Sequence, residues 1–286
     1  MINIAVPLFL AISGYFFASK KTDNKKVSYL GTLFKQIKRV YIPYVVWSCI
    51  FILFMFLISG HFSLKSSLYK LLSFQTSVTY YYVALIIQLY IIGPLLLKYH
   101  LKAVFIISCI ISLALAIYFN YYTYNSGHSL PLIVYAGNAL TWLMFFVLGI
   151  IIQRSQFKIN TRLLLIGAFI FLLLSILETY GWMEVGVSVQ YAASAVKFSS
   201  FLYSACIIML LLQFKRNWKL FSRLGQYSYG IYLMHLIILT IISKIIILNS
   251  FIGDLLLGII TLFISYGICF IANSLDKNIA KKYLGI

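Results

Sequence analysis

The feature that most constrains this chain is a series of long apolar segments separated by short clusters of basic residues. A helix that crosses about 30 Å of hydrocarbon needs roughly 17–25 predominantly apolar residues. Segments of this kind recur along the whole sequence, and we expect nine of them to span a membrane. The predicted spans are residues 2–18, 40–58, 80–97, 103–122, 136–152, 163–180, 196–212, 227–243 and 251–272.

The composition argues against a water-soluble domain. Of the 286 residues, 63% are hydrophobic and only 10% are charged, whereas a soluble domain is about half apolar and a quarter charged. Lipid must therefore cover most of the surface. The sequence predicts an all-α fold, a polytopic transmembrane helical bundle in which residues 1–286 form a single membrane-embedded domain.

The positive charge predicts the orientation and the partners. Nineteen of the 23 Lys and Arg residues fall in the C-terminal tail or in the loops after the first, third, fifth and seventh predicted spans. Because positively charged loops stay in the cytoplasm, we expect a cytoplasmic C-terminus. A net charge of +18 in a soluble protein would suggest nucleic acid. Here the basic residues flank apolar spans, so we expect the lipid bilayer as partner and no nucleic acid.

Two connecting segments have the apolar spacing of a helix. In the linker 20–39, Lys35 and Lys38 lie off an apolar stripe, which predicts a short helix in the membrane interface. The segment 59–79 has the same pattern, with Lys65 and Lys70 beside its leucines. The four cysteines lie within apolar stretches without the spacing of a metal or redox pair, so we expect neither a metal site nor a disulfide framework.

Ionisable side chains inside a bundle cost about 2.5–3.5 kcal/mol each on insertion scales, so each needs a role or a route to water. His235 lies in the middle of a predicted span, and it is either bonded within the bundle or functional. Lys197, Glu178 and Asp254 lie near span ends. We expect these three side chains to reach an interface.

Four segments carry a resemblance to a known family. Residues 5–16 read AVPLFLAISGYF, residues 38–44 read KRVYIPY, residues 142–149 read WLMFFVLG and residues 227–235 read YSYGIYLMH. In order and spacing they resemble motifs of the acyltransferase 3 family, among them Pro-x-Phe…Ser-Gly-Tyr/Phe and Ser-x-x-Ile-Tyr-Leu-x-His. Members of this family are bacterial membrane acyltransferases that modify cell-surface and extracellular glycans.

The resemblance implies an activity and a location. An acyl group, acetyl above all, would pass from a cytoplasmic acyl-CoA co-substrate to a hydroxyl of a glycan acceptor, with no bound cofactor. The protein would cross the bacterial plasma (inner) membrane many times. The family's first span, with its arginine and its catalytic histidine, has no counterpart in these residues. We therefore expect either an upstream start or a shortened member.

The chemistry of such a transfer points to particular side chains. A hydroxyl is a weak nucleophile at neutral pH, and histidine has the pKa of a suitable base. We expect His235 in a supporting catalytic role, with Tyr232 one helical turn before it. Lys35, Lys38 and Arg39 would bind the CoA phosphates or would anchor the topology.

Further substrate-binding candidates have two interpretations each. Ser13 and Gly14 would permit the close approach of a ligand to the backbone, or would only let helices pack closely. Tyr81 and Tyr82 suit an aromatic belt at the interface or the rim of a carbohydrate-binding cleft. Two other functions stay open, namely a polysaccharide export component without bond chemistry and a truncated, inactive family member.

Overall fold

The computed structural model describes residues 4–19, 29–128, 130–155, 159–213, 219–246 and 250–286, and within these ranges it contains no β-strand. The predicted all-α fold class is therefore confirmed. Each predicted span overlaps a helix of the described part. These helices are α1 (Ala5–Ser19), α2 (Tyr29–Ser59), α4 (Tyr81–Leu96), α5 (Leu101–Ser126), α7 (Leu143–Ser155), α8 (Thr161–Glu184), α10 (Phe198–Gln213), α11 (Lys219–Ile245) and α12 (Phe251–Leu275).

Helix length separates these elements into two groups. Among the described residues, five helices are long and apolar enough to cross a membrane, namely α2, α5, α8, α11 and α12. The helices α1, α4, α7 and α10 are apolar but shorter. The chain is therefore a polytopic helical membrane protein. The number of crossings and the cytoplasmic C-terminus stay predictions.

The chain divides into two compact units, each assembled from two separate stretches of sequence. Unit 1 comprises Met1–Val27 and Ala84–Lys215, and unit 2 comprises Ser28–Val83 and Arg216–Ile286. Each unit has its own buried residues. The single membrane-embedded domain predicted for residues 1–286 stays a prediction.

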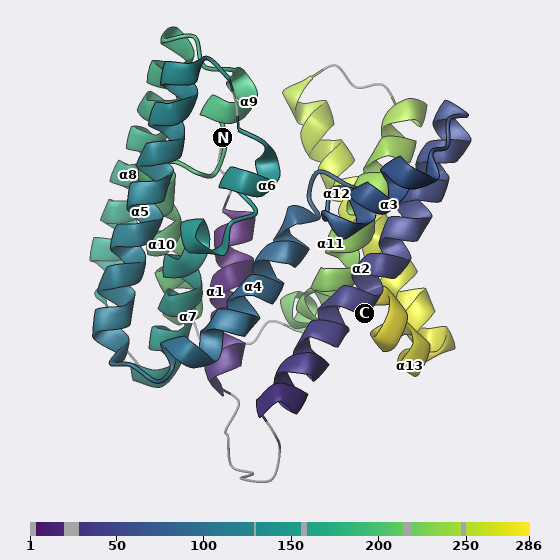
Figure 1. Ribbon diagram of the computed structural model, residues 1–286, viewed down its shortest axis with the longest axis horizontal. Coiled ribbons are helices and arrows are strands. Elements are labelled where there is room, and N and C mark those ends of the chain that lie inside the picture. The colour runs from purple at the N-terminus through teal and green to yellow at the C-terminus, as the bar shows by residue number, and fades with distance from the viewer. Residues whose placement is uncertain (1–3, 20–28, 129, 156–158, 214–218, 247–249) are drawn as a thin grey trace. The chain divides into compact units, whose positions relative to one another are not determined.

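In unit 1, two glycines let α1 and α7 pack backbone against backbone (Figure 1). A Cβ added to Gly14 would collide with the carbonyl oxygen of Phe146, and one added to Gly149 would collide with the carbonyl oxygen of Ala11. Both contacts lie within one helical turn on each helix, so the two backbones are closest there. Small residues allow this close approach in membrane bundles, where helices gain little from hydrophobic burial.

The predicted span 136–152 is wrong at its beginning, because residues 136–138 form a loop before the short helix η1 (Ala139–Trp142). Side chains pair the backbone groups of this irregular segment. The Gln88 amide donates to the carbonyl of Gly137 (3.0 Å) and accepts from the N–H of Ala139 (3.2 Å). Trp142 Nε1 donates to the carbonyl of Ala136 (2.7 Å). Non-helical backbone is tolerated in a membrane bundle where such partners exist.

In unit 2, α2 is one continuous helix that passes through the buried Pro43. Residues 29–39 of the linker 20–39 are helical, as their spacing predicted, but they continue into α2 and do not form a short helix of their own. Residues 20–28 lie outside the described residues. Pro43 lacks an N–H, so one carbonyl of the preceding turn loses its helical donor. The hydroxyl of Tyr229 on α11 donates to the neighbouring carbonyl of Val40 (2.7 Å) and ties the two helices together at this point.

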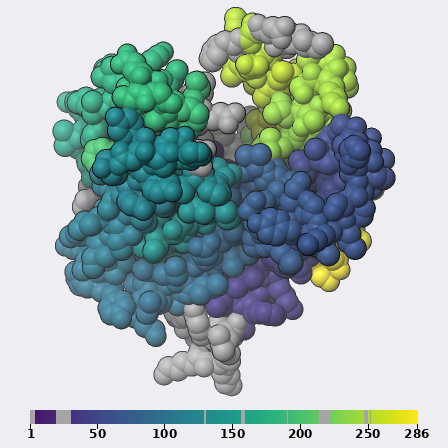
Figure 2. Space-filling model, turned by 45° about the horizontal axis from the view of Figure 1, so that its top comes forward, coloured from purple at the N-terminus to yellow at the C-terminus, as the bar shows by residue number. Residues whose placement is uncertain are grey.

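The segment 59–79 contains the predicted helix, α3 (Leu64–Leu72). The hydroxyl of Ser63 caps it by accepting from the N–H of Ser66 (3.4 Å). No residue of α3 is buried, and its blue surface is visible in Figure 2. At the other end of the chain, η2 (Ala280–Leu284) follows the short helix α13 (Lys277–Ile279) and packs on α2, where Trp47 Nε1 donates to the carbonyl of Leu284 (3.3 Å).

Candidate functional site

In unit 2, the tyrosine and histidine side chains that could bind a substrate or transfer a proton lie on and around α11. Five tyrosines from α2, α11 and the segment before and at the start of α4 form a group of ring contacts, which we call the tyrosine cluster. The Tyr82 ring meets the Tyr232 ring edge-on with centroids 5.4 Å apart, and the Tyr44 and Tyr80 centroids are 5.5 Å apart. The members of the cluster are Tyr44, Tyr80, Tyr82, Tyr229 and Tyr232.

Hydroxyl groups of the cluster fix α11 to the segment before α4. Tyr232 donates to the carbonyl of Thr79, and Tyr80 donates in the opposite direction to the carbonyl of Leu233 (2.7 Å). Tyr80 is 1% exposed. Because each buried hydroxyl has an acceptor, these bonds contribute to stability and hold the rings in place.

His235 lies one turn after Tyr232, and its ring is oriented by the same helix. Its Nδ1 lies 2.6 Å from the carbonyl oxygen of Tyr232. A carbonyl only accepts, so this bond assigns the proton of the neutral ring to Nδ1 and the lone pair to Nε2. The side chain is half-buried, and in this tautomer Nε2 is the acceptor nitrogen of the ring. His235 can therefore accept a hydrogen bond or a proton from a bound group.

Several hydroxyl side chains lie in the segment before α4, to which Tyr232 is hydrogen-bonded. Ser48 Oγ and Thr76 Oγ1 pair with each other at 2.9 Å. In contrast, Ser77 Oγ and Thr79 Oγ1 are buried and have no hydrogen-bond partner within the described part of the chain. Buried hydroxyls of this kind are usually satisfied by ordered water or by a ligand.

Lys35, Lys38 and Arg39 form an exposed basic stripe on the first part of α2, at positions i, i+3 and i+4 of one helix face. The backbone carbonyl of the next residue, Val40, accepts a hydrogen bond from the Tyr229 hydroxyl on α11. His235 follows Tyr229 by six residues, which is about 9 Å along the helix at 1.5 Å per residue. Unit 2 therefore carries a cationic surface and an oriented histidine on two joined helices.

The structure brings only some of the predicted site residues together. Tyr82, Tyr232 and His235 are neighbours in unit 2, and Tyr81 is the first residue of α4. Ser13 and Gly14 belong to unit 1, where the packing of α1 on α7 already accounts for Gly14. Their role in substrate binding stays a prediction.

Unit 1 has a separate buried polar group around Lys197, and the prediction that this side chain reaches an interface is wrong. Lys197 is 0% exposed, and its Nζ donates to the carbonyl of Ser175 (3.3 Å) and to the Thr179 hydroxyl. Glu178 is half-buried and accepts from the N–H of Ser199 (3.0 Å) and from its hydroxyl. Partners on α8 thus replace water for Lys197.

Sequence reasoning missed the uncharged members of unit 1 that pair irregular backbone. Gln88 bonds the loop before η1, and Asn120 donates from α5 to the carbonyl of Val196 (3.0 Å). Both are single amides inside otherwise apolar segments. That isolation was the available signal, because a polar side chain in a membrane helix needs a partner.

The comparisons with known proteins give one assignment. The family model described as an acyltransferase domain, of the acyltransferase 3 type, matches residues 1–273. Searches of curated proteins and of solved structures found no significant match.

Proposed function

The chain belongs to the acyltransferase 3 family, and from this premise we propose that it transfers an acyl group, acetyl above all, from a cytoplasmic acyl-CoA to a glycan. The acceptor is a hydroxyl of a cell-envelope or extracellular polysaccharide. The protein acts as a multi-pass enzyme of the bacterial plasma membrane. The family match and the apolar helices support a membrane acyltransferase in general. Donor, acyl group and acceptor are the proposal.

The observation that carries the proposal is the orientation of His235. In the transfer, the acceptor oxygen forms a bond to the thioester carbonyl carbon, the carbon–sulfur bond breaks, and the hydroxyl proton ends on the CoA sulfur. Nε2 of His235 carries the free lone pair when Nδ1 bonds the Tyr232 carbonyl. His235 supports the reaction by accepting the hydrogen bond of the acceptor hydroxyl and by helping to move its proton.

The remaining residues of unit 2 supply binding. The basic stripe of Lys35, Lys38 and Arg39 binds the CoA phosphates, since exposed cations at helical spacing suit several phosphate oxygens. The half-buried Tyr81 contributes to the rim of the acceptor site, and the buried Tyr82 packs against Tyr232 next to it. The unpaired hydroxyls of Ser77 and Thr79 support a polyhydroxylated ligand, which offers both donors and acceptors.

The experiment compares two histidine substitutions in proteoliposomes supplied with labelled acetyl-CoA and the isolated glycan. His235→Gln should lower kcat about tenfold or more, because proton transfer is impaired. The matched control, His61→Gln, changes an exposed histidine outside the tyrosine cluster and should leave kcat unchanged. Equal rates for the two variants would remove His235 from the reaction.

A cellular measurement separates the alternatives. An acyltransferase predicts that a deletion strain exports its glycan with the acyl substituents missing. An export component without bond chemistry predicts trapped glycan with unchanged substituents. No transfer in vitro together with an unaltered glycan in the deletion strain would contradict the proposed function and favour an inactive member of the family.

A further inference from the structure

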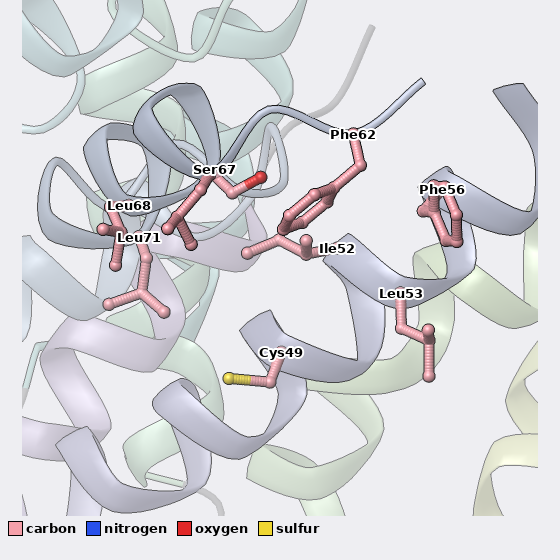
Figure 3. Close-up of a pocket in the computed structure, with 9 residues that line it drawn as sticks. Cys49, Ile52, Leu53, Phe56, Phe62, Ser67, Leu68 and Leu71 are labelled. Carbon is pink, nitrogen blue, oxygen red and sulfur yellow. The ribbon is translucent and has the colours of Figure 1, made fainter. Parts of the chain in front are cut away.

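Unit 2 contains an apolar groove of about 320 Å³ between the C-terminal half of α2 and α3 (Figure 3). In Figure 3, the Cys49 thiol on α2 points to the side on which Leu68 and Leu71 of α3 lie. The walls are hydrocarbon apart from this thiol and one serine hydroxyl. The groove is lined by Cys49, Ile52, Leu53, Phe56, Phe62, Leu64, Ser67, Leu68 and Leu71.

The protein does not fill this groove. Leu64 and Leu68, which line it from α3, are 63% and 50% exposed, and Leu53 on the α2 side is 57% exposed. The volume is at the lower end of the range of about 300–1,000 Å³ that is usual for small-molecule sites. One extended hydrocarbon chain fits such a volume, whereas a partner helix about 10 Å across would not enter it.

The charge on α3 indicates which kind of lipid headgroup accompanies a hydrocarbon chain in the groove. The residues that line the groove from α3 occupy one helix face, and Lys65 and Lys70 lie about 110° to either side of its centre. Both lysines are exposed, and α2 and α3 contain no Asp or Glu. An apolar face edged by lysines is typical of a helix that rests on anionic headgroups.

We propose that the groove holds one acyl chain of an anionic phospholipid, whose negative headgroup is attracted by Lys65 and Lys70 on the two flanks of α3. This lipid site is independent of the acyl transfer proposed above. It is connected to the tyrosine cluster, because the Tyr44 hydroxyl donates to the carbonyl of Leu71 on α3 (2.6 Å). A lipid chain in the groove therefore contacts the helix that positions Tyr44.

The first experiment uses Cys49, an exposed thiol in the groove, as the reporter. The purified full chain in detergent is alkylated with a maleimide in the presence of phosphatidylglycerol or of phosphatidylcholine with the same acyl chains. Phosphatidylglycerol should protect Cys49 at a concentration roughly tenfold lower, because each lysine near an anionic headgroup adds affinity. Glycerol 3-phosphate alone should not protect it. The half-buried Cys109 on α5 should react equally with both lipids.

Two sets of variants test the two parts of the site. The double substitution Lys65→Gln/Lys70→Gln should abolish the difference between the lipids. Ser67→Phe fills the groove and should remove the phosphatidylglycerol that native mass spectrometry detects on the protein. Its matched control, Ser66→Phe, places the same ring on the opposite face of α3 and should retain the lipid.

Several outcomes would overturn the proposal. Equal protection by both lipids, unchanged by the lysine substitutions, would show that no anionic headgroup is recognised. Equal lipid retention by the two phenylalanine variants would show that the chain lies elsewhere. Protection of Cys49 only by a co-purified polypeptide would show that the groove is a protein interface.

Discussion

Replacing the two glycines between α1 and α7 tests whether the close helix contact stabilises unit 1. In Gly14→Ala the new Cβ would lie 2.9 Å from the carbonyl carbon of Phe146, whereas ordinary contact begins at 3.4 Å. In Gly149→Ala it would lie 2.8 Å from the backbone nitrogen of Tyr15. The obstructing atoms are backbone, so no side-chain rotation relieves the clash, and the helices must separate by at least 0.5 Å.

The expected loss follows from this separation. A gap of about 0.5–1 Å removes a quarter to a half of the dispersion energy of each affected atom pair. Overpacking of this kind typically costs about 1–3 kcal/mol. Alanine returns up to about 1 kcal/mol through its helix propensity. We therefore expect each single variant to lose about 1–2 kcal/mol of unfolding free energy.

The double variant gives the sharper test. One displacement of α1 from α7 relieves both clashes, so Gly14→Ala/Gly149→Ala should lose less than the sum of the single losses. Unfolding in mixed micelles with increasing SDS, followed by tryptophan fluorescence, measures the free energies. Gly181→Ala on α8 is the control, because nothing lies within 4 Å of its added Cβ. Wild-type stability in both single variants, or full additivity in the double variant, would refute the reasoning.

Three further substitutions have expected outcomes in the same unfolding assay. Lys197→Ala should lower the free energy of unfolding by about 2–4 kcal/mol, because it leaves a cavity and removes two hydrogen bonds. Lys197→Met keeps most of the side-chain volume and should lower it less. Equal losses in the two variants would contradict this. Gln88→Leu should cost about 2–4 kcal/mol by leaving a buried carbonyl and N–H unpaired. Gln88→Glu should cost less at acidic pH, where the protonated carboxyl can still donate to Gly137 and accept from Ala139. Unchanged stability in Gln88→Leu would show that these two bonds do not stabilise the loop 136–138. Gly285→Ala should lower the free energy of unfolding by about 1–3 kcal/mol, because φ is +74° and the added Cβ would lie 2.7 Å from the Tyr229 ring. Unchanged stability together with unchanged Trp47 emission would show that the C-terminal segment is not packed against Tyr229 and α2.

The membrane helices could be predicted because the length and apolarity of a segment are enough to identify it as a membrane helix, whatever its neighbours are. The segment 227–243, for example, needs no knowledge of its neighbours to be identified as a helix. The irregular residues 136–138 could not be predicted in this way. Their stability depends on Gln88, which lies about fifty positions earlier and reads in the sequence only as one polar residue within a span.

The candidate site was predictable to a similar extent. His235 stood out because ionisable groups are rare and expensive within a span, and Tyr232 stood out because it lies one helical turn before His235. Their partners did not stand out, since Thr79 and Leu233 act through backbone carbonyls that every residue possesses. The burial of Lys197 depends on its partners Ser175 and Thr179, on a helix about twenty residues away, so its position near a span end was misleading.

The interleaved composition of the two units has a consequence for biosynthesis. The ribosome delivers α2 and α3 directly after α1, and it then spends on the order of ten seconds on residues 84–215, at about 5–20 residues per second, before α11 emerges. During that interval the Val40 carbonyl and the Tyr80 hydroxyl lack their partners on α11, which are the Tyr229 hydroxyl and the Leu233 carbonyl. Insertion factors or chaperones that shield early segments should therefore matter most for α2 and for the residues just before α4, and pausing translation between α10 and α11 should leave these two parts the most susceptible to proteolysis.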